Sequence, residues 1–136
     1  RYKLASRSIY DDSLIASLVS TKKPIIASLG YWIKHDPMLQ KVPDIDNTKY
    51  LYCISSYPTQ PHELAFSTVN FDRISGFSDH TIGLHASFLS ISLGATIIEK
   101  HFTLDKTMYG PDHSCSMEPF ELKELASFVN FYNQAC

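Results

Sequence analysis

The chain alternates between short apolar runs and segments suited to helices. Each apolar run ends in polar residues, as buried strands do where they meet loops. The predicted strands cover residues 2–6, 24–28, 49–56, 74–80 and 95–103. Helices are expected at residues 14–20, 38–42, 62–69, 82–93 and 119–134. This alternation predicts βα units and a parallel sheet.

Capping residues set the expected helix ends. Asp11, Asp12 or Ser13 can cap the first helix, and Thr81 is expected to cap the helix over 82–93, which Gly94 ends. The first helix carries an apolar stripe of Leu14, Ile15, Leu18 and Val19. In the last helix the residues expected to face a core are Phe120, Leu122, Leu125, Phe128, Val129 and Tyr132.

Composition narrows the function classes. With 136 residues, 44% of them hydrophobic, the chain can bury one core, so residues 1–136 are expected to form one domain. A formal net charge of −2 argues against nucleic acid as a partner. No apolar stretch approaches the ~18 residues of a membrane span. The widely spaced Cys53, Cys115 and Cys136 favour a reduced, cytoplasmic setting.

Polar residues follow the carboxyl end of every predicted strand, where parallel α/β proteins bind ligands. They are Ser6, Ser28, Ser55, Ser56, Asp79, His80, Glu99, Lys100 and His101. The strands predict either a small open sheet or part of a TIM-type (β/α)₈ barrel. A full barrel needs roughly 250 residues, so about five βα units would supply only its second part.

The two histidines at strand ends have two possible roles. His80 and His101 could jointly hold a divalent metal, or they could be ordinary polar residues near a pocket. Glu99 stands two residues before His101 and shares its face of the strand, whereas Lys100 points to the other face. Glu99 could orient water or move a proton, or it could form an ion pair with Lys3 or Lys100.

Hydroxyl groups around one cation have the composition of a phosphate site. This set comprises Lys3, Ser6, Ser28, Ser55 and Ser78. Asp79 is expected to support the site without contacting substrate. Asp112 could bind sugar hydroxyls or cap a turn.

Several long motifs in order resemble the sialic acid synthase family of N-acetylneuraminate and related nonulosonate synthases. The motifs are G-F-S-D-H-T-x-G at 76–83, L-G-A-x-I-I-E-K-H-F-T-L-D at 93–105 and G-P-D-H-x-x-S-x-x-P at 110–119. The resemblance implies the C-terminal part of a TIM-barrel domain. It also implies condensation of phosphoenolpyruvate with an N-acetylated hexose of the N-acetylmannosamine type, which yields a sialic acid or related nonulosonic acid and releases phosphate.

The resemblance also implies a role for each candidate residue. A Mn²⁺ or Mg²⁺ ion would be held by His80 and His101, and Glu99 would orient a water molecule or take its proton. Ser116 would lie on a loop that closes the site, and Tyr57 and Asp112 would line the sugar side. The residues expected to bind phosphoenolpyruvate are Lys3, Ser6, Ser28, Ser55 and Ser78.

Departures from the family pattern keep other functions open. Ser8 stands where the family usually has an acidic residue, Ser55 stands where many members have asparagine, and the segment 31–48 is short. The N-terminal barrel strands and the antifreeze-like domain are expected to be absent, with a homo-oligomer or partner chain completing the barrel. The alternatives are a non-catalytic sugar- or phosphate-binding remnant and another metal-dependent barrel enzyme, such as a hydrolase.

Overall fold

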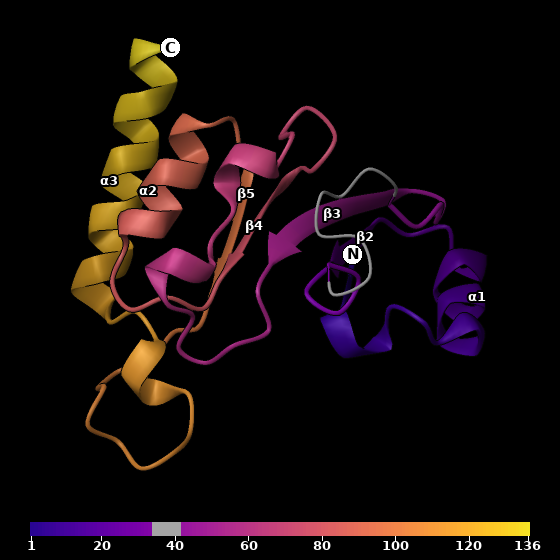
Figure 1. The fold of residues 1–136 in the computed structure, drawn as a ribbon, viewed down its shortest axis with the longest axis horizontal. Coiled ribbons are helices and arrows are strands. Elements are labelled where there is room, and N and C mark those ends of the chain that lie inside the picture. Colours follow the sequence, from indigo (N-terminus) through magenta and orange to yellow (C-terminus); the bar gives the residue numbers. More distant parts are fainter. Residues whose placement is uncertain (34–41) are drawn as a thin grey trace.

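A parallel sheet forms the centre of the protein, with strands in the order β1-β2-β3-β4-β5 (Figure 1). This computed structural model describes residues 1–33 and 42–136. The strands are β1 (Tyr2–Leu4), β2 (Ile25–Ser28), β3 (Thr48–Cys53), β4 (Gly76–Asp79) and β5 (Ile97–Lys100). The helices are α1 (Asp12–Ser20), α2 (His85–Ser92) and α3 (Pro119–Ala135). Neighbouring strands are all parallel, so the fold is the α/β half-barrel that the sequence predicts.

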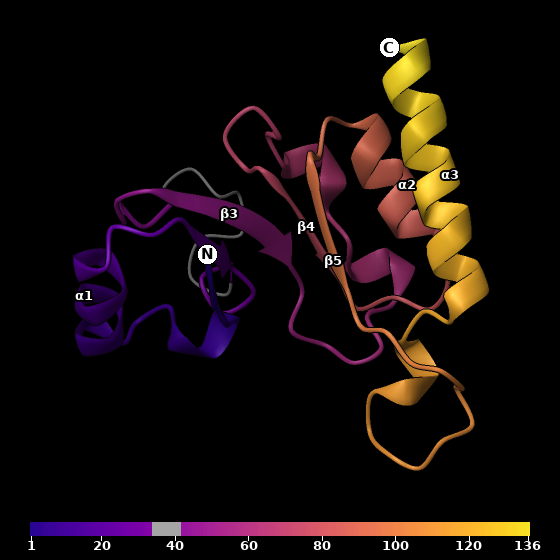
Figure 2. The same ribbon diagram turned by 180° about the vertical axis from the view of Figure 1, so that it is seen from behind.

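The helices cover one face of this sheet. Figure 1 shows α1 beside β2 and β3 at one end of the molecule, and α2 next to α3 at the other end, beyond β5. The view from behind shows the same order (Figure 2). Buried residues on the helix-facing side of the strands include Leu4, Ile25, Ala27, Tyr52 and Phe77. Because side chains alternate along a strand, the residues between them point to the opposite, concave face.

The predicted cap of the first helix is confirmed, and the last helix begins at Pro119, as expected. The Asp11 carboxylate accepts a hydrogen bond of 3.0 Å from the backbone N–H of Leu14. Pro119 occupies the first turn of α3, where the Glu118 N–H donates to the Glu121 carboxylate at 2.8 Å.

The predicted cap of α2 is wrong. The helix begins at His85, not at residue 82, and Leu84 occupies the N-cap position. The Thr81 N–H and hydroxyl both donate to Asp79, so the hydroxyl does not cap a helix. Gly83, with a φ of 76°, separates Thr81 from the helix.

Other local predictions also need correction. The single helix expected at 62–69 is two short 3₁₀ helices, Pro61–Glu63 and Phe66–Thr68. The Tyr52 hydroxyl accepts from the Ala65 N–H between them, so a contact with the sheet replaces a helical hydrogen bond. The strands are also shorter than predicted, because the polar residues at their ends leave the sheet.

Three residues assigned to apolar faces are exposed to solvent. Phe120 and Leu122 lie on the outer side of α3, which packs instead through Leu125, Phe128, Val129 and Tyr132. Leu14 is likewise exposed, whereas Ile15, Leu18 and Val19 of α1 contact the core. The helix predicted at 38–42 lies outside the described residues, apart from Val42, which is not helical.

Two further features concern the whole described chain. Within residues 1–33 and 42–136, no helix combines the length and hydropathy that a membrane-spanning segment needs. Strands β4 and β5 approach each other closely at Gly76, where an added Cβ atom would lie 2.0 Å from the Ile97 carbonyl oxygen. Only glycine fits at this position, which is two residues before Ser78.

Candidate active site

One cavity of about 500 Å³ lies at the carboxyl ends of the strands, on the concave face. The predicted site residues that line it are Lys3, Ser6, Ser28, Ser55, Tyr57, Ser78, His80, Glu99 and His101. These residues come from all five strands or from the turns that directly follow them. The parallel arrangement therefore brings together side chains that are up to 98 positions apart, from Lys3 to His101.

The neutral ring of His80 is held in one tautomer by a neighbouring carbonyl. Its Nδ1 atom lies 2.8 Å from the carbonyl oxygen of Ile54. Because a carbonyl can only accept, Nδ1 carries the proton and Nε2 keeps its lone pair. Burial lowers the pKa of His80, which favours the neutral imidazole. A neutral imidazole whose Nδ1 proton is bound by a carbonyl can ligate a metal through its free Nε2 atom.

His101 lies beside His80, and their ring centres are 5.7 Å apart. Two imidazoles that share one ion through metal–nitrogen bonds of about 2.1 Å place their ring centres roughly 4.5 to 5.5 Å apart, so the observed separation is slightly wider than that of a bound pair. Tyr57 packs against both rings, with centre separations of 4.1 Å to His80 and 5.8 Å to His101. No group of three or more metal-ligating side chains occurs in the described part of the chain. The pair would therefore leave most coordination positions open to water and substrate.

Glu99 joins two strands through its side chain. The Ser78 hydroxyl donates to Glu99 Oε1 at 2.8 Å, and Lys3 Nζ lies 3.4 Å from the same oxygen. Lys3 also donates to the Ser28 hydroxyl at 2.9 Å. Of the two predicted ion-pair partners, Glu99 contacts Lys3, whereas Lys100 contacts Asp79. The Glu99 side chain is 42% exposed, so it is also accessible to water in the cavity.

Cys53 also lines the cavity, although the sequence pattern did not predict it. Its sulfur accepts a hydrogen bond from Ser6 at 3.7 Å and lies 3.8 Å from His80 Nδ1. Burial raises the pKa of the Cys53 thiol and so favours its neutral form. Its position two residues before Ser55, on a strand that alternates between faces, was a usable signal.

Arg7 and Tyr31 also line the cavity and were missed. Both follow strand ends, Arg7 in the 3₁₀ helix Ser6–Ser8 and Tyr31 after Gly30. The alternation of side chains along a strand does not extend into such turns, so the sequence did not indicate that Arg7 and Tyr31 face the cavity. Arg7 adds a second cation to a cavity whose only carboxylate among the described residues is Glu99.

Asp112 and Ser116 do not line this cavity. The buried Ser116 hydroxyl donates to the Asp112 carbonyl at 2.8 Å, so it stabilises the loop that follows β5. The pKa of the Tyr57 phenol is raised mainly by burial, with smaller contributions from Cys53 and then from Asp112. That loop projects from the end of the sheet (orange in Figures 1 and 2). The predicted role of Asp112 at the sugar and that of Ser116 on a closing loop would both require this loop to approach the cavity.

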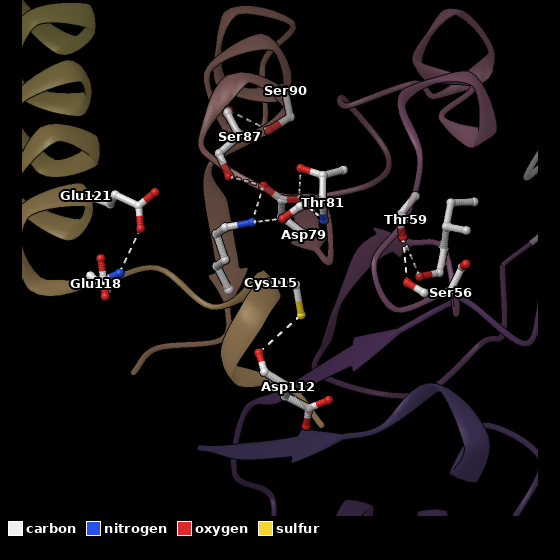
Figure 3. A network of polar contacts seen from close by, with 12 residues as sticks. Ser56, Thr59, Asp79, Thr81, Ser87, Ser90, Asp112, Cys115, Glu118 and Glu121 are labelled. Carbon is white, nitrogen blue, oxygen red and sulfur yellow. Dashed lines mark hydrogen bonds and ion pairs between the residues drawn. The ribbon is translucent and has the colours of Figure 1, made fainter. Parts of the chain in front are cut away.

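Asp79 lies on the other face of β4, away from the cavity. Figure 3 shows Thr81 and Ser87 pointing at its carboxylate. The Asp79 residue is 1% exposed and does not line the cavity, in agreement with the expected supporting role.

This fold and this arrangement of side chains define a half-barrel with a ligand site at the carboxyl ends of its strands. The chain belongs to the NeuB family, whose model matches residues 1–136. It is 38% identical over 138 residues to a pseudaminic acid synthase of Helicobacter pylori, covering 94% of this chain and 40% of that protein. It is 43% identical over 94 residues to an N,N'-diacetyllegionaminic acid synthase of Campylobacter jejuni, covering 65% of this chain and 28% of that protein.

A solved structure supports the same relationship. The crystal structure of an N-acetylneuraminic acid synthetase from Leptospira borgpetersenii superposes with a TM-score of 0.81 at 29% identity. The match covers 98% of this chain and 50% of that one. Where nearly all of this chain aligns with a curated relative, it spans about two fifths of that relative's length. It spans half of this structural neighbour.

Proposed function

We propose that the chain provides part of the active site of a nonulosonate synthase. The reaction would condense phosphoenolpyruvate with an N-acetylated hexose of the N-acetylmannosamine type and release phosphate. The supporting observation is the single cavity that brings Lys3 and several serine hydroxyls together with His80, His101 and Glu99. A cation and hydroxyls suit the phosphate and carboxylate of phosphoenolpyruvate.

The proposal includes a divalent metal, Mn²⁺ or Mg²⁺, held by His80 and His101. The fixed tautomer of His80 and the 5.7 Å separation of the two rings support this ligand pair. When bound, the metal would supply Lewis acidity toward the aldehyde oxygen of the open-chain sugar. Tyr57 would keep both imidazoles in place by packing against their faces and edges.

The remaining steps are assigned to the side chains of the chain itself. The C2=C3 electron pair of phosphoenolpyruvate forms the bond from C3 to the aldehyde carbon and leaves C2 electron-deficient, and the aldehyde oxygen takes up a proton from solvent. Water then adds to C2, and Glu99 takes the proton that this water loses. The bond from C2 to the bridging phosphate oxygen breaks, the proton of the new hydroxyl leaves with the phosphate, and the keto group forms. Ser78 holds Glu99 in the orientation for this proton transfer.

The edge strands of the sheet and the free cysteines support two further parts of the proposal, an assembly partner and a cellular location. Each of β1 and β5 has one strand neighbour among the described residues, so further strands, supplied by another part of the protein, by a partner chain or by a second copy, would complete the barrel. The three cysteines, Cys53, Cys115 and Cys136, are free, which supports a reduced, cytoplasmic setting.

A condensation assay on the complete gene product tests the proposal. Mn²⁺, phosphoenolpyruvate and N-acetylmannosamine are supplied, and both released phosphate and the 2-keto acid product are measured. The expected result is equal amounts of phosphate and keto acid. Absence of phosphate release with every N-acetylhexose, together with retained binding of phosphoenolpyruvate, would instead support the non-catalytic binding module.

A further inference from the structure

Strands β4 and β5 carry a second set of paired residues on the face opposite the cavity. Ser78 and Glu99 are register partners on the cavity face, and Asp79 and Lys100 are the next register pair. The side chains of Asp79 and Lys100 are 0% and 1% exposed. This second pair therefore sits between Ser78 and His80 on one strand and between Glu99 and His101 on the other.

Each charged atom of the buried Asp79–Lys100 pair has at least one polar partner. Lys100 Nζ lies 3.1 Å from Asp79 Oδ2 and donates to the Thr81 carbonyl at 2.6 Å. Asp79 Oδ1 accepts from both the N–H and the hydroxyl of Thr81 at 2.8 Å, and Oδ2 accepts from Ser87 at 2.6 Å (Figure 3). Within the described chain, no buried side-chain nitrogen or oxygen lacks a partner. A buried charge pair of this kind is rigid, because losing any one contact would leave a charge without a partner in a low-dielectric interior, which is costly.

These contacts connect the two histidines through the back of the sheet. Thr81 directly follows His80, and Lys100 directly precedes His101. The bond from Lys100 to the Thr81 carbonyl therefore prevents the end of β4 from sliding along β5. Such sliding would change the 5.7 Å separation of the two imidazoles and the 2.8 Å contact between Ser78 and Glu99.

We propose that Asp79 and Lys100 are positioning residues that set the spacing of His80 and His101 and, through it, the affinity of the site for a divalent cation. Neither residue lines the 500 Å³ cavity, although Lys100 borders a smaller hollow of about 140 Å³ beside it. Because both side chains are buried, both act through the strand ends. The inference rests on the proposed two-histidine metal site, and it adds residues that the metal would never contact. Groups that orient metal ligands from outside typically change metal affinity about 10- to 100-fold.

The test compares Mn²⁺ binding by the complete gene product in three variants, measured by electron paramagnetic resonance of free Mn²⁺. Lys100→Met is expected to weaken binding about 10- to 100-fold. Lys100→Arg, which keeps the charge, is expected to stay within about 3-fold of the wild type. Lys106→Met breaks the ion pair of Lys106 with Glu121, which lies away from the cavity, and is the matched control. It is expected to lower the unfolding temperature without changing Mn²⁺ affinity.

A second measurement does not depend on metal. Crystal structures of the metal-free wild type and Lys100→Met are expected to show different separations of the His80 and His101 rings. If Lys100→Met does not fold, Asp79→Asn/Lys100→Met removes both charges, leaves no unpaired one, and is measured in the same way. Unchanged ring separation and unchanged Mn²⁺ affinity in the folded variant overturn the proposal. If the wild type binds no Mn²⁺, the metal part of the proposed function fails, and the ring separation alone decides the positioning role.

Discussion

The Ser78 hydroxyl donates a 2.8 Å hydrogen bond to Glu99 Oε1 across two adjacent strands. The same oxygen faces Lys3 Nζ at 3.4 Å, so both contacts fall on one side of the carboxylate. Oε2 accepts no hydrogen bond within the described residues and is the oxygen that remains for water. A carboxylate held on one side and open on the other is suited to take a proton in a fixed direction.

Replacing Glu99 by glutamine is expected to reduce kcat about 10²- to 10⁴-fold, because the amide cannot take a proton from water. The side chain keeps its shape, and its oxygen can still accept from Ser78. The lost ion pair with Lys3 is partly exposed, so the free energy of unfolding should change by less than about 1 kcal/mol. Phosphate release and urea unfolding measure the two effects. Wild-type kcat in Glu99→Gln contradicts the assignment of the proton acceptor.

Replacing His101 by alanine is expected to abolish Mn²⁺-dependent phosphate release and to weaken Mn²⁺ binding at least 10-fold. The ring is only partly buried, so the circular dichroism spectrum should not change. Isothermal titration with Mn²⁺ measures the affinity. His85→Ala removes an exposed imidazole on α2 and is the control, with wild-type binding expected. Activity that survives in His101→Ala shows that the metal ligands are wrongly assigned.

Much of the fold was predictable because apolar runs and polar endings coincide with real strands. The run around Ile97 and Ile98 identifies β5, and the alternation around Glu99 and His101 correctly places both on one face. These predictions depend only on neighbours in the sequence, where periodicity is informative.

The errors arise where another side chain takes a hydrogen bond on which the predicted helix depended. Thr81 has the side chain of a cap, but Asp79 accepts both its N–H and its hydroxyl. Tyr52 accepts from the Ala65 N–H in the same way and interrupts the helix expected there. Such side-chain hydrogen bonds, local at Asp79 and long-range at Tyr52, override helix propensity and leave no periodic trace in the sequence.

Arg7 is expected to bind an anionic group of a substrate. Its guanidinium has no partner within the described residues, whereas Lys3 contacts Glu99 and Ser28. Arg7→Gln should therefore raise KM for the anionic substrate about 10-fold and change kcat by less than about 3-fold. Steady-state kinetics with phosphoenolpyruvate and the sugar varied in turn measure both constants. Lys123→Gln changes an exposed cation on α3 and serves as the control; equal KM values in Arg7→Gln and Lys123→Gln contradict the prediction.

The pH dependence of stability should carry a contribution from His80. Burial lowers its pKa in the folded protein below the ordinary value of 6.5, so below pH 6.5 the unfolded chain binds the proton more strongly. In metal-free protein, the free energy of unfolding should therefore decline as the pH falls from 6.5 through the folded pKa. Urea unfolding with EDTA between pH 7.5 and 5 measures this decline, which His80→Gln should reduce and His85→Gln should retain. Parallel profiles for the wild type and His80→Gln contradict it.

Gly76 allows β4 and β5 to approach closely enough for Ser78 to reach Glu99. An alanine Cβ at this position would lie 2.0 Å from the Ile97 carbonyl oxygen, and the strands would have to separate. Gly76→Ala is expected to reduce the free energy of unfolding by about 3 kcal/mol or more. Gly83→Ala is the matched control: its φ of 76° is strained for alanine, but the nearest atom is 3.8 Å away, so about 1 to 2 kcal/mol is expected. Urea unfolding ranks the two variants, and an equal or smaller loss for Gly76→Ala shows that the strands can separate there at little cost.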